Sequence, residues 1–212
     1  MINMSNTDRK KHFMQLFGPN LGAKYHVLLN HVIHIHMKWA QISELVKTPE
    51  RRSLLKSAGG YFFIEVHKVF TDDVILCLSR LTDPAQQGRQ ENLSLYALLD
   101  DISDPSLKSK IEDLINEAKD KIAPLKEHRH KRIAHFDLDV ALKNPGFNLP
   151  RIGNQSIDEA LSAVGKVLGQ LQDEYEGTST VWDWVPTGAV PDIEGLLIYL
   201  ESGLDQEESR RR

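Results

Sequence analysis

An arginine and a histidine, Arg129 and His135, lie near the end of a long predicted helix. An arginine fork binds phosphate or carboxylate, and a histidine gains and loses protons near neutral pH. Upstream, apolar residues recur at three- and four-residue steps, and Arg129 takes the next position on their stripe. The stripe comprises Leu107, Ile111, Leu114, Ile115, Ala118, Ile122 and Leu125. Burying a guanidinium there requires an acidic neighbour or a cleft that holds solvent and ligand.

The spacing of these two residues sets a geometric condition on any shared site. At roughly 100° per residue, His135 lies about 120° around an ideal helix from Arg129. The two side chains meet one ligand if the helix end is loosened, if the arginine reaches across, or if a second copy of the chain contributes. One interpretation is therefore a ligand site. The other is a cationic last turn that complements the helix macrodipole.

The charge of the whole chain and the charge of this segment differ in sign. The chain carries a formal net charge of −4, which argues against broad, charge-driven binding of nucleic acid. The segment itself is basic, with Lys126, Lys131 and Arg132 around the arginine and histidines. The sequence therefore allows a local basic patch on an otherwise acidic protein.

The segment Arg129-His130-Lys131-Arg132-Ile133-Ala134-His135 resembles the motif of the HEPN superfamily, an arginine and a polar residue followed after a short spacer by histidine. Three upstream blocks resemble the AbiU-type abortive-infection branch, in the expected order. These blocks are Gly60-Tyr61-Phe62-Phe63, Leu78-Ser79-Arg80-Leu81-Thr82-Asp83-Pro84 and Glu91-Asn92-Leu93-Ser94-Leu95.

The resemblance implies an all-α fold, an antiparallel helical bundle of HEPN type with a short irregular C-terminal segment. It also implies a metal-independent endoribonuclease of a prokaryotic defence or toxin–antitoxin system, with no cofactor. RNA carries its own nucleophile, the 2′-hydroxyl, so cleavage needs proton transfer and charge stabilisation. His135 would transfer protons, Arg129 would clamp the phosphate, and His130 would orient the phosphate or share the acid–base work. In this family the sites of two subunits face one another, which implies a homodimer.

Further residues are expected to support the site. Lys126, Lys131 and Arg132 would line an RNA groove, and Asp137 would hold the ring of His135. Arg80 and Asp83 lie three residues apart at a predicted helix end. A local ion pair between them is the favoured interpretation, and the alternative is that one of them reaches the motif helix.

Two other functions stay open at this stage. A non-catalytic HEPN module would bind nucleotide or RNA, or serve in assembly, and it could bury both motif residues. A toxin or defence effector held inactive by an antitoxin or other inhibitory partner is compatible with the ribonuclease. Solvent exposure of His135 separates the ribonuclease from the buried module.

Composition and periodicity predict one helical domain over residues 1–204 and a disordered charged tail over residues 205–212. No uninterrupted apolar run approaches the roughly 20 residues of a membrane span, so a cytoplasmic protein is expected. The single cysteine, Cys77, has no partner within the chain for a disulfide. A strand-like alternation around Trp182 and Trp184 forms the irregular segment.

Turn and capping signals divide the chain into helices. Asn6 or Thr7 is expected to cap the first helix, Thr48 to cap the helix that begins at Pro49, and Gly59-Gly60 to separate two helices. The predicted capping box Ser156 to Glu159 opens a helix whose apolar residues form a seam for another helix, in this subunit or a twin. The expected helices cover residues 7–17, 21–45, 49–58, 61–81, 94–99, 105 to the motif, 138–142, 157–175 and 192–202.

Overall fold

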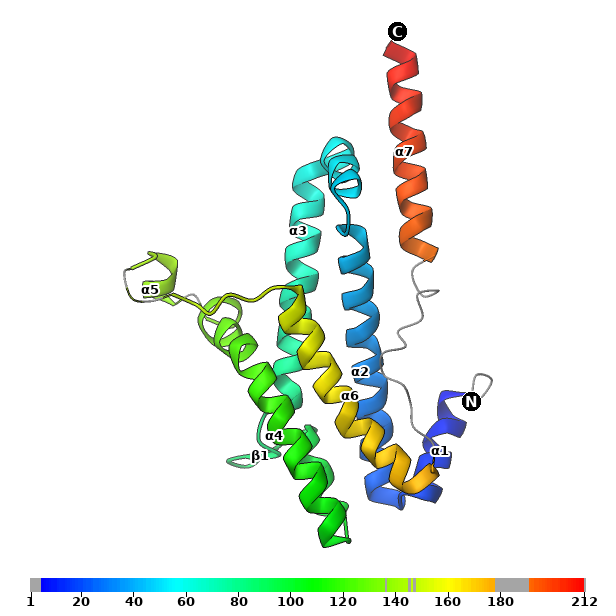
Figure 1. The fold of residues 1–212 in the computed structure, drawn as a ribbon, viewed down its shortest axis with the longest axis vertical. Coiled ribbons are helices and arrows are strands. Elements are labelled where there is room, and N and C mark those ends of the chain that lie inside the picture. The colour runs from blue at the N-terminus through cyan, green and yellow to red at the C-terminus, as the bar shows by residue number, and fades with distance from the viewer. Residues whose placement is uncertain (1–4, 136, 145, 147, 178–190, 212) are drawn as a thin grey trace. The chain divides into compact units, whose positions relative to one another are not determined.

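The computed structural model describes residues 5–135, 137–144, 146, 148–177 and 191–211, and it is an all-α fold (Figure 1). Its helices are α1 (Asn6–Leu16), α2 (Pro19–Leu45), α3 (Pro49–Leu81), η1 (Leu95–Asp101), α4 (Pro105–His128), η2 (Arg129–Ile133), α5 (Leu138–Ala141), α6 (Asn154–Glu176) and α7 (Pro191–Arg211). Two short antiparallel strands, β1 (Gln86–Gln87) and β2 (Gln90–Glu91), form a hairpin in the predicted loop 85–91. Among the described helices, none is long and apolar enough to cross a membrane.

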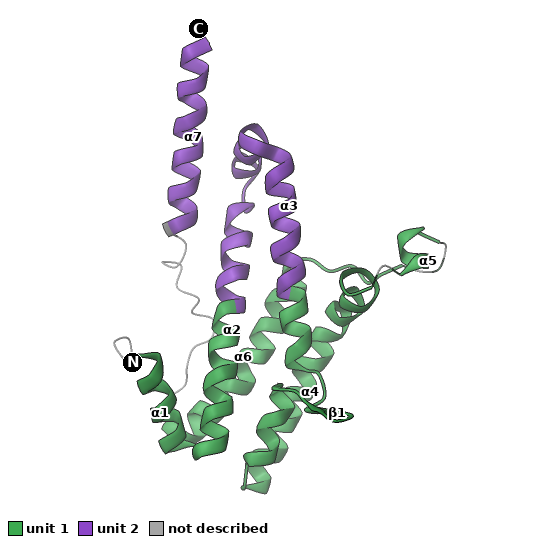
Figure 2. Ribbon diagram, turned by 180° about the vertical axis from the view of Figure 1, so that it is seen from behind, with its two compact units in different colours: residues 1–34, 75–183 green, residues 35–74, 184–212 purple. Residues whose placement is uncertain are grey.

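The chain groups into two compact units (Figure 2). One comprises residues 1–34 and 75–183, and the other comprises residues 35–74 and 184–212. Helices α2 and α3 each contribute residues to both units. The sequence predicts one domain over residues 1–204, and that domain boundary stays a prediction.

Helices α4 and α6 run antiparallel and form the core of the first unit (Figure 1). The predicted stripe of α4 is buried except for the half-buried Leu114, and the predicted seam of α6 is buried except for the half-buried Tyr175. The fully buried residues include Ile111, Ile115, Ala118, Ile122 and Leu125 of α4 and Val164, Leu168 and Leu171 of α6. Ion pairs of 2.9 Å between Lys121 and Glu159 and of 2.8 Å between Lys166 and Glu117 flank this contact. The α6 seam therefore has its partner helix within the same chain.

The first unit also contains a tight crossing of α1 and α2. Phe13 packs edge-on against Tyr25, with ring centroids 4.9 Å apart. A Cβ built at Gly22 would lie only 2.2 Å from the backbone oxygen of Phe13, so only glycine allows the two backbones to approach this closely. Helix α1 is capped by Ser5, whose Oγ accepts the Asp8 N–H at 3.1 Å, rather than by Asn6 or Thr7 as predicted.

Helix α3 bends at Gly59, in agreement with the predicted break. Its N-terminus is capped as predicted, because Thr48 Oγ1 accepts the Arg51 N–H at 3.3 Å. At Gly59 the backbone leaves the helical conformation, with φ 170° and ψ 58°. Within the second unit, Arg51 then pairs with Glu44 at 2.7 Å and with Glu194 of α7 at 2.5 Å.

The predicted N-terminus of α6 is wrong. Helix α6 begins at Asn154, so Ser156 is not the N-cap. Instead, Ser156 Oγ accepts the N–H of the N-cap residue Gly153 at 3.4 Å, which is how a residue in the third helical position completes the first turn.

Helix α7 continues to Arg211, through the tail predicted to be disordered. An Arg211–Glu207 ion pair and a hydrogen bond of 2.8 Å from Ser209 Oγ to the Asp205 carbonyl bridge successive turns of this helix end. The predicted strand-like segment at Trp182 and Trp184 lies outside the described residues.

Candidate functional site

The motif begins where α4 widens into the π-helical turn η2. The Ala134 N–H donates to the Arg129 carbonyl at 2.8 Å, five residues back, and the Asp137 N–H donates to the Lys131 carbonyl at 3.1 Å. A π-helical turn carries more residues per turn than an α-helix, and such turns often occur at functional sites. The helix end is therefore loosened, which is one of the three conditions under which Arg129 and His135 meet a common ligand.

Arg129 is half-buried and bound to an acidic residue. Its Nη1 donates to Oδ1 and Oδ2 of Asp83, at 3.0 and 2.8 Å, and 22% of the arginine side chain is exposed. This carboxylate is the acidic neighbour that the position of Arg129 on the apolar stripe requires. Both contacts with Asp83 use Nη1, and a guanidinium has further N–H groups on Nε and Nη2 that can bind a second acceptor.

Asp83 also binds the preceding turn of α4. Lys126 Nζ lies 3.1 Å from Asp83 Oδ1 and donates to the Thr82 carbonyl at 2.9 Å. Among the described residues, the ion pairs of Asp83 are with Arg129 and Lys126, and the exposed Arg80 forms none with it. The interpretation favoured from the sequence, a local Arg80–Asp83 ion pair, is wrong, and the alternative in which Asp83 reaches the motif helix is correct. Tertiary packing decides this, since the end of α3 lies against the end of α4.

The two motif histidines are exposed. His130 lies within η2 and His135 follows it, and both side chains face solvent. By contrast, His128 is half-buried, and its Nε2 donates to the Pro150 carbonyl at 2.7 Å. His128 thus fixes the end of α4 to the chain that leads into α6. The sequence analysis missed this role, because nothing in the local pattern distinguishes His128 from its neighbours.

Asp137 caps the short helix α5. Its Oδ1 accepts the Val140 N–H at 3.1 Å, and α5 is the extra turn predicted over residues 138–142. The carboxylate therefore fixes the backbone just after His135. Its predicted contact with the ring of His135 stays a prediction.

Several basic residues of the segment are paired with carboxylates. Lys131 lies 3.1 Å from Glu127, one turn earlier, and Lys126 shares Asp83 with Arg129. On the adjoining turns of α4, a hydrogen bond to Glu159 raises the pKa of Lys121. Arg132 is half-buried within η2. The positive field around the motif is consequently weaker than the residue types alone indicate.

Together these features define an all-α protein with an arginine–histidine motif on a widened helix end. The family model described as AbiU2 matches residues 18–188, a span that includes α2 to α6 and the whole motif. The chain belongs to this HEPN family, the AbiU2 type of abortive-infection proteins, as the sequence resemblance predicted. No curated protein and no solved structure matches the chain.

Proposed function

We propose that this protein is a metal-independent endoribonuclease of an abortive-infection or toxin–antitoxin system, with Arg129 and His135 at its centre. The observation that carries the proposal is the contrast between the two residues. Arg129 is anchored to Asp83 through Nη1, and His135 is exposed directly after a π-helical turn. A buried, purely structural motif would not require an exposed histidine.

The proposed reaction uses the nucleophile that RNA supplies. A base removes the proton from the 2′-hydroxyl, whose oxygen attacks the adjacent phosphorus while the bond from phosphorus to the 5′-oxygen breaks. The leaving oxygen takes up a proton, and the products are a 2′,3′-cyclic phosphate and a 5′-hydroxyl. His135 would move these protons, and the free donors of Arg129 would bind the phosphate as its negative charge rises. His130 would assist by binding the phosphate or transferring the second proton.

RNA binding and dimerisation complete the proposal. Lys131 and Arg132 lie on the same turn as His130 and would contact phosphates beside the scissile one, together with Lys126. A second copy would bring another Arg129 and His135 to the cleft. Two opposed cationic sites would attract the polyanionic strand between them.

The direct test is cleavage of a mixed RNA pool in excess chelator. Native protein should cut RNA, leave DNA intact and produce cyclic phosphate ends, and His135→Ala and Arg129→Ala should each abolish cutting. His34→Ala and Arg89→Ala are matched controls, because both residues are exposed and lie outside the motif. Equal cutting by native protein and both motif variants would rule out this site.

A second candidate function is a non-catalytic HEPN module that binds nucleotide or RNA, or serves in assembly. The pairing of Lys126 and Lys131 with carboxylates favours it, because a paired cation gains less from a phosphate. Such a module would bind RNA without cutting it, and His135→Ala would leave binding unchanged. Filter binding with the same pool, run beside the cleavage assay, separates the two functions.

Expression in a bacterial host tests the toxin hypothesis. If an inhibitory partner normally holds the enzyme inactive, native protein expressed alone should slow growth, and His135→Ala should relieve the defect at the same protein level. Equal growth with both would contradict the toxin hypothesis.

A further inference from the structure

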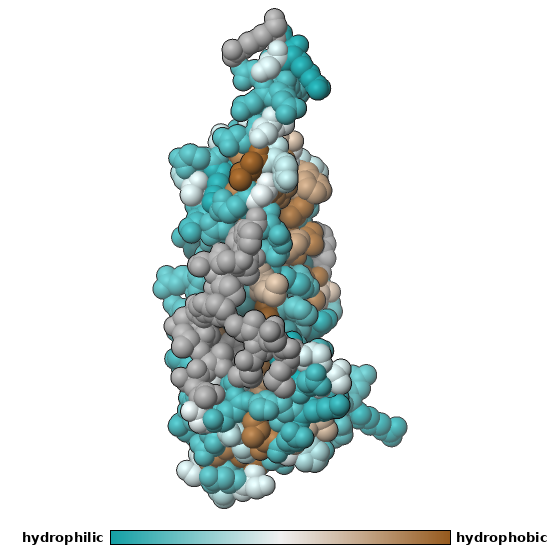
Figure 3. Space-filling model, turned by 90° about the vertical axis from the view of Figure 1, so that its right-hand side faces the viewer, coloured by the Kyte–Doolittle hydropathy of each residue, from teal (hydrophilic) through white to brown (hydrophobic). Residues whose placement is uncertain are grey.

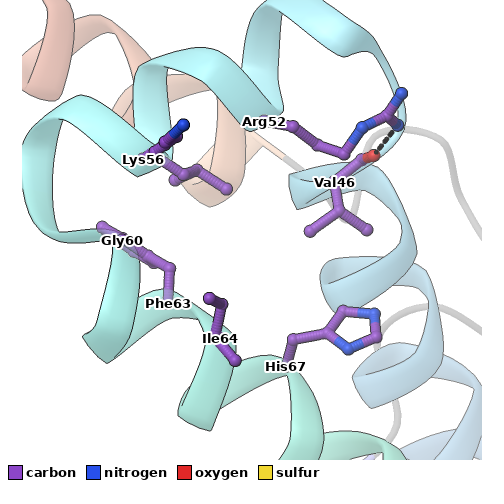
Figure 4. A pocket seen from close by; sticks show the side chains of 8 residues that line it. Val46, Arg52, Lys56, Gly60, Phe63, Ile64 and His67 are labelled. Carbon is purple, nitrogen blue, oxygen red and sulfur yellow. Dashed lines mark hydrogen bonds between the residues drawn. The ribbon is translucent and has the colours of Figure 1, made fainter.

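The second unit contains a cavity of about 440 Å³ beside the bend in α3. Val46, which follows α2, lies on one side, and the two segments of α3 before and after Gly59 form the others (Figure 4). The bend creates this space, because it turns the first segment of α3 away from the axis of the second. The apolar lining consists of Val46, Leu55, Gly60, Phe63 and Ile64.

Every ionisable residue that lines the cavity is basic. They are Arg52, Lys56 and His67, in a chain whose formal net charge is −4. Arg52 is held in place, since its Nη1 donates to the Val46 carbonyl at 2.7 Å and the Lys47 carbonyl at 3.3 Å (Figure 4). Lys56 is exposed, and His67 is half-buried. The cavity is therefore a space with apolar walls and a cationic rim.

The apolar lining continues onto the surface. Ile64 is 64% exposed, and Tyr61 and Phe62, three and two residues before it in the sequence, are 80% and 64% exposed. Apolar patches also interrupt the largely polar surface in the space-filling view (Figure 3). An exposed apolar wall beside cations that face solvent is suited to a ligand with both an apolar and an anionic part.

We propose that this cavity binds a small amphiphilic carboxylate, with the carboxylate at Lys56 and Arg52 and the apolar chain against Leu55, Phe63 and Ile64. The charge complementarity selects an anion over a neutral or cationic molecule of the same shape. The volume lies within the range of small-molecule sites and accommodates a chain of medium length. This site is independent of the proposed ribonuclease centre.

The test uses the full chain and decanoate below its micellar concentration, with 1-decanol and decyltrimethylammonium as probes of matched length. Calorimetry should show one decanoate per chain and much weaker binding of the other two. Shortening the chain to octanoate should weaken binding by roughly three- to fourfold for each methylene removed. Lys56→Gln should weaken decanoate binding about tenfold, and Lys56→Arg should retain it.

Two variants test the location by filling the cavity. Within 4 Å, a Cβ built at Gly60 meets two atoms, Lys56 Cγ at 3.6 Å and Lys56 Cβ at 3.9 Å. Both are ordinary van der Waals distances, so Gly60→Leu is compatible with the fold. Ile64→Trp replaces an exposed side chain. Both should abolish decanoate binding without changing the circular dichroism spectrum. Lys68→Gln, which removes an exposed cation of α3, should leave the affinity unchanged.

Three results would overturn the proposal. The first is equal affinity for decanoate, decanol and decyltrimethylammonium, and the second is decanoate binding that both filling variants leave intact. The third is the absence of decanoate binding together with a dimer that Ile64→Trp converts to a monomer in sedimentation experiments. That third result would assign this apolar surface to a contact between copies of the chain.

Discussion

Asp83 and Arg129, 46 residues apart in the sequence, form a double hydrogen bond through Nη1 of the arginine, at 3.0 and 2.8 Å. The same carboxylate lies 3.1 Å from Lys126 Nζ. One acidic residue just after α3 therefore compensates one cation of α4 and one of η2. It also holds Nη1 of the guanidinium, so a bound phosphate would use the N–H groups on Nε and Nη2.

Removal of the Asp83 charge should destabilise the protein. Asp83→Asn leaves two half-buried cations without their counter-charge, and we expect a loss of about 1–3 kcal/mol in the free energy of unfolding. Urea denaturation measures this loss. The exposed Glu91→Gln is the matched control and should change stability by less than about 0.5 kcal/mol.

A double-mutant cycle with Arg129→Ala isolates the contact itself. Part of the Asp83→Asn cost should disappear when the arginine is already absent, and we expect a coupling energy of about 0.5–3 kcal/mol. Strictly additive effects of the two substitutions would show that the ion pair contributes nothing to stability.

Mixing two inactive variants tests whether the proposed site is shared between subunits. Suppose that each site takes its arginine from one chain and its histidine from the other. A dimer of one Arg129→Ala chain and one His135→Ala chain then retains one intact site, because the first chain still supplies His135 and the second still supplies Arg129. An equimolar, re-equilibrated mixture should then recover about a quarter of native activity, since about half of the dimers are mixed and each has one site of two. The measurement is RNA cleavage before and after mixing, and no recovery would indicate that both residues act from the same chain.

Gly22 should tolerate no side chain. A Cβ at this position would meet the Phe13 backbone at 2.2 Å, so Gly22→Ala forces α1 away from α2 and should cost more than about 2 kcal/mol. Thermal unfolding monitored by circular dichroism measures the effect. Gly203→Ala is the control, because a Cβ there meets nothing within 4 Å and alanine favours the helix. A Gly22→Ala protein as stable as the native one would contradict the close crossing.

His26 should make stability depend on pH. Burial, with the nearby charges of Arg9 and Lys10, lowers the pKa of His26 in the folded protein. The unfolded chain therefore binds a proton more readily than the folded protein does. The neutral ring of His26 makes its full contribution to the free energy of unfolding above the pKa of histidine in the unfolded chain, about 6.5. This contribution decreases as the pH falls toward the lower pKa of His26 in the folded protein.

The corresponding measurement is urea denaturation at pH 7.5 and 5.5. Native protein should lose more stability between these values than His26→Gln, which has no group to titrate at that position. His34→Gln, at an exposed histidine of the same helix, should keep the native pH dependence. A pH dependence unchanged in His26→Gln would assign it to other groups.

The helices and the location of the motif follow from local sequence patterns. The apolar spacing of α4 and α6 predicts their buried faces, because a helix repeats every 3.6 residues whatever it packs against. The break at Gly59 and the cap at Thr48 are likewise local, and they are confirmed. Two predicted caps are wrong, because Ser5 and Gly153 cap α1 and α6 in place of neighbouring residues. Several polar residues close together satisfy the same sequence pattern.

The tertiary structure decided which groups meet. The α6 seam predicts a partner helix but not that this partner is α4 of the same chain. The position of Arg129 on an apolar stripe predicts an acidic neighbour, yet the choice between Arg80 and Arg129 as the partner of Asp83 depends on how α3 packs against α4. The cavity beside Gly59 has the same origin. A pairing across many residues depends on the packing of whole helices, and local periodicity carries no information about that packing.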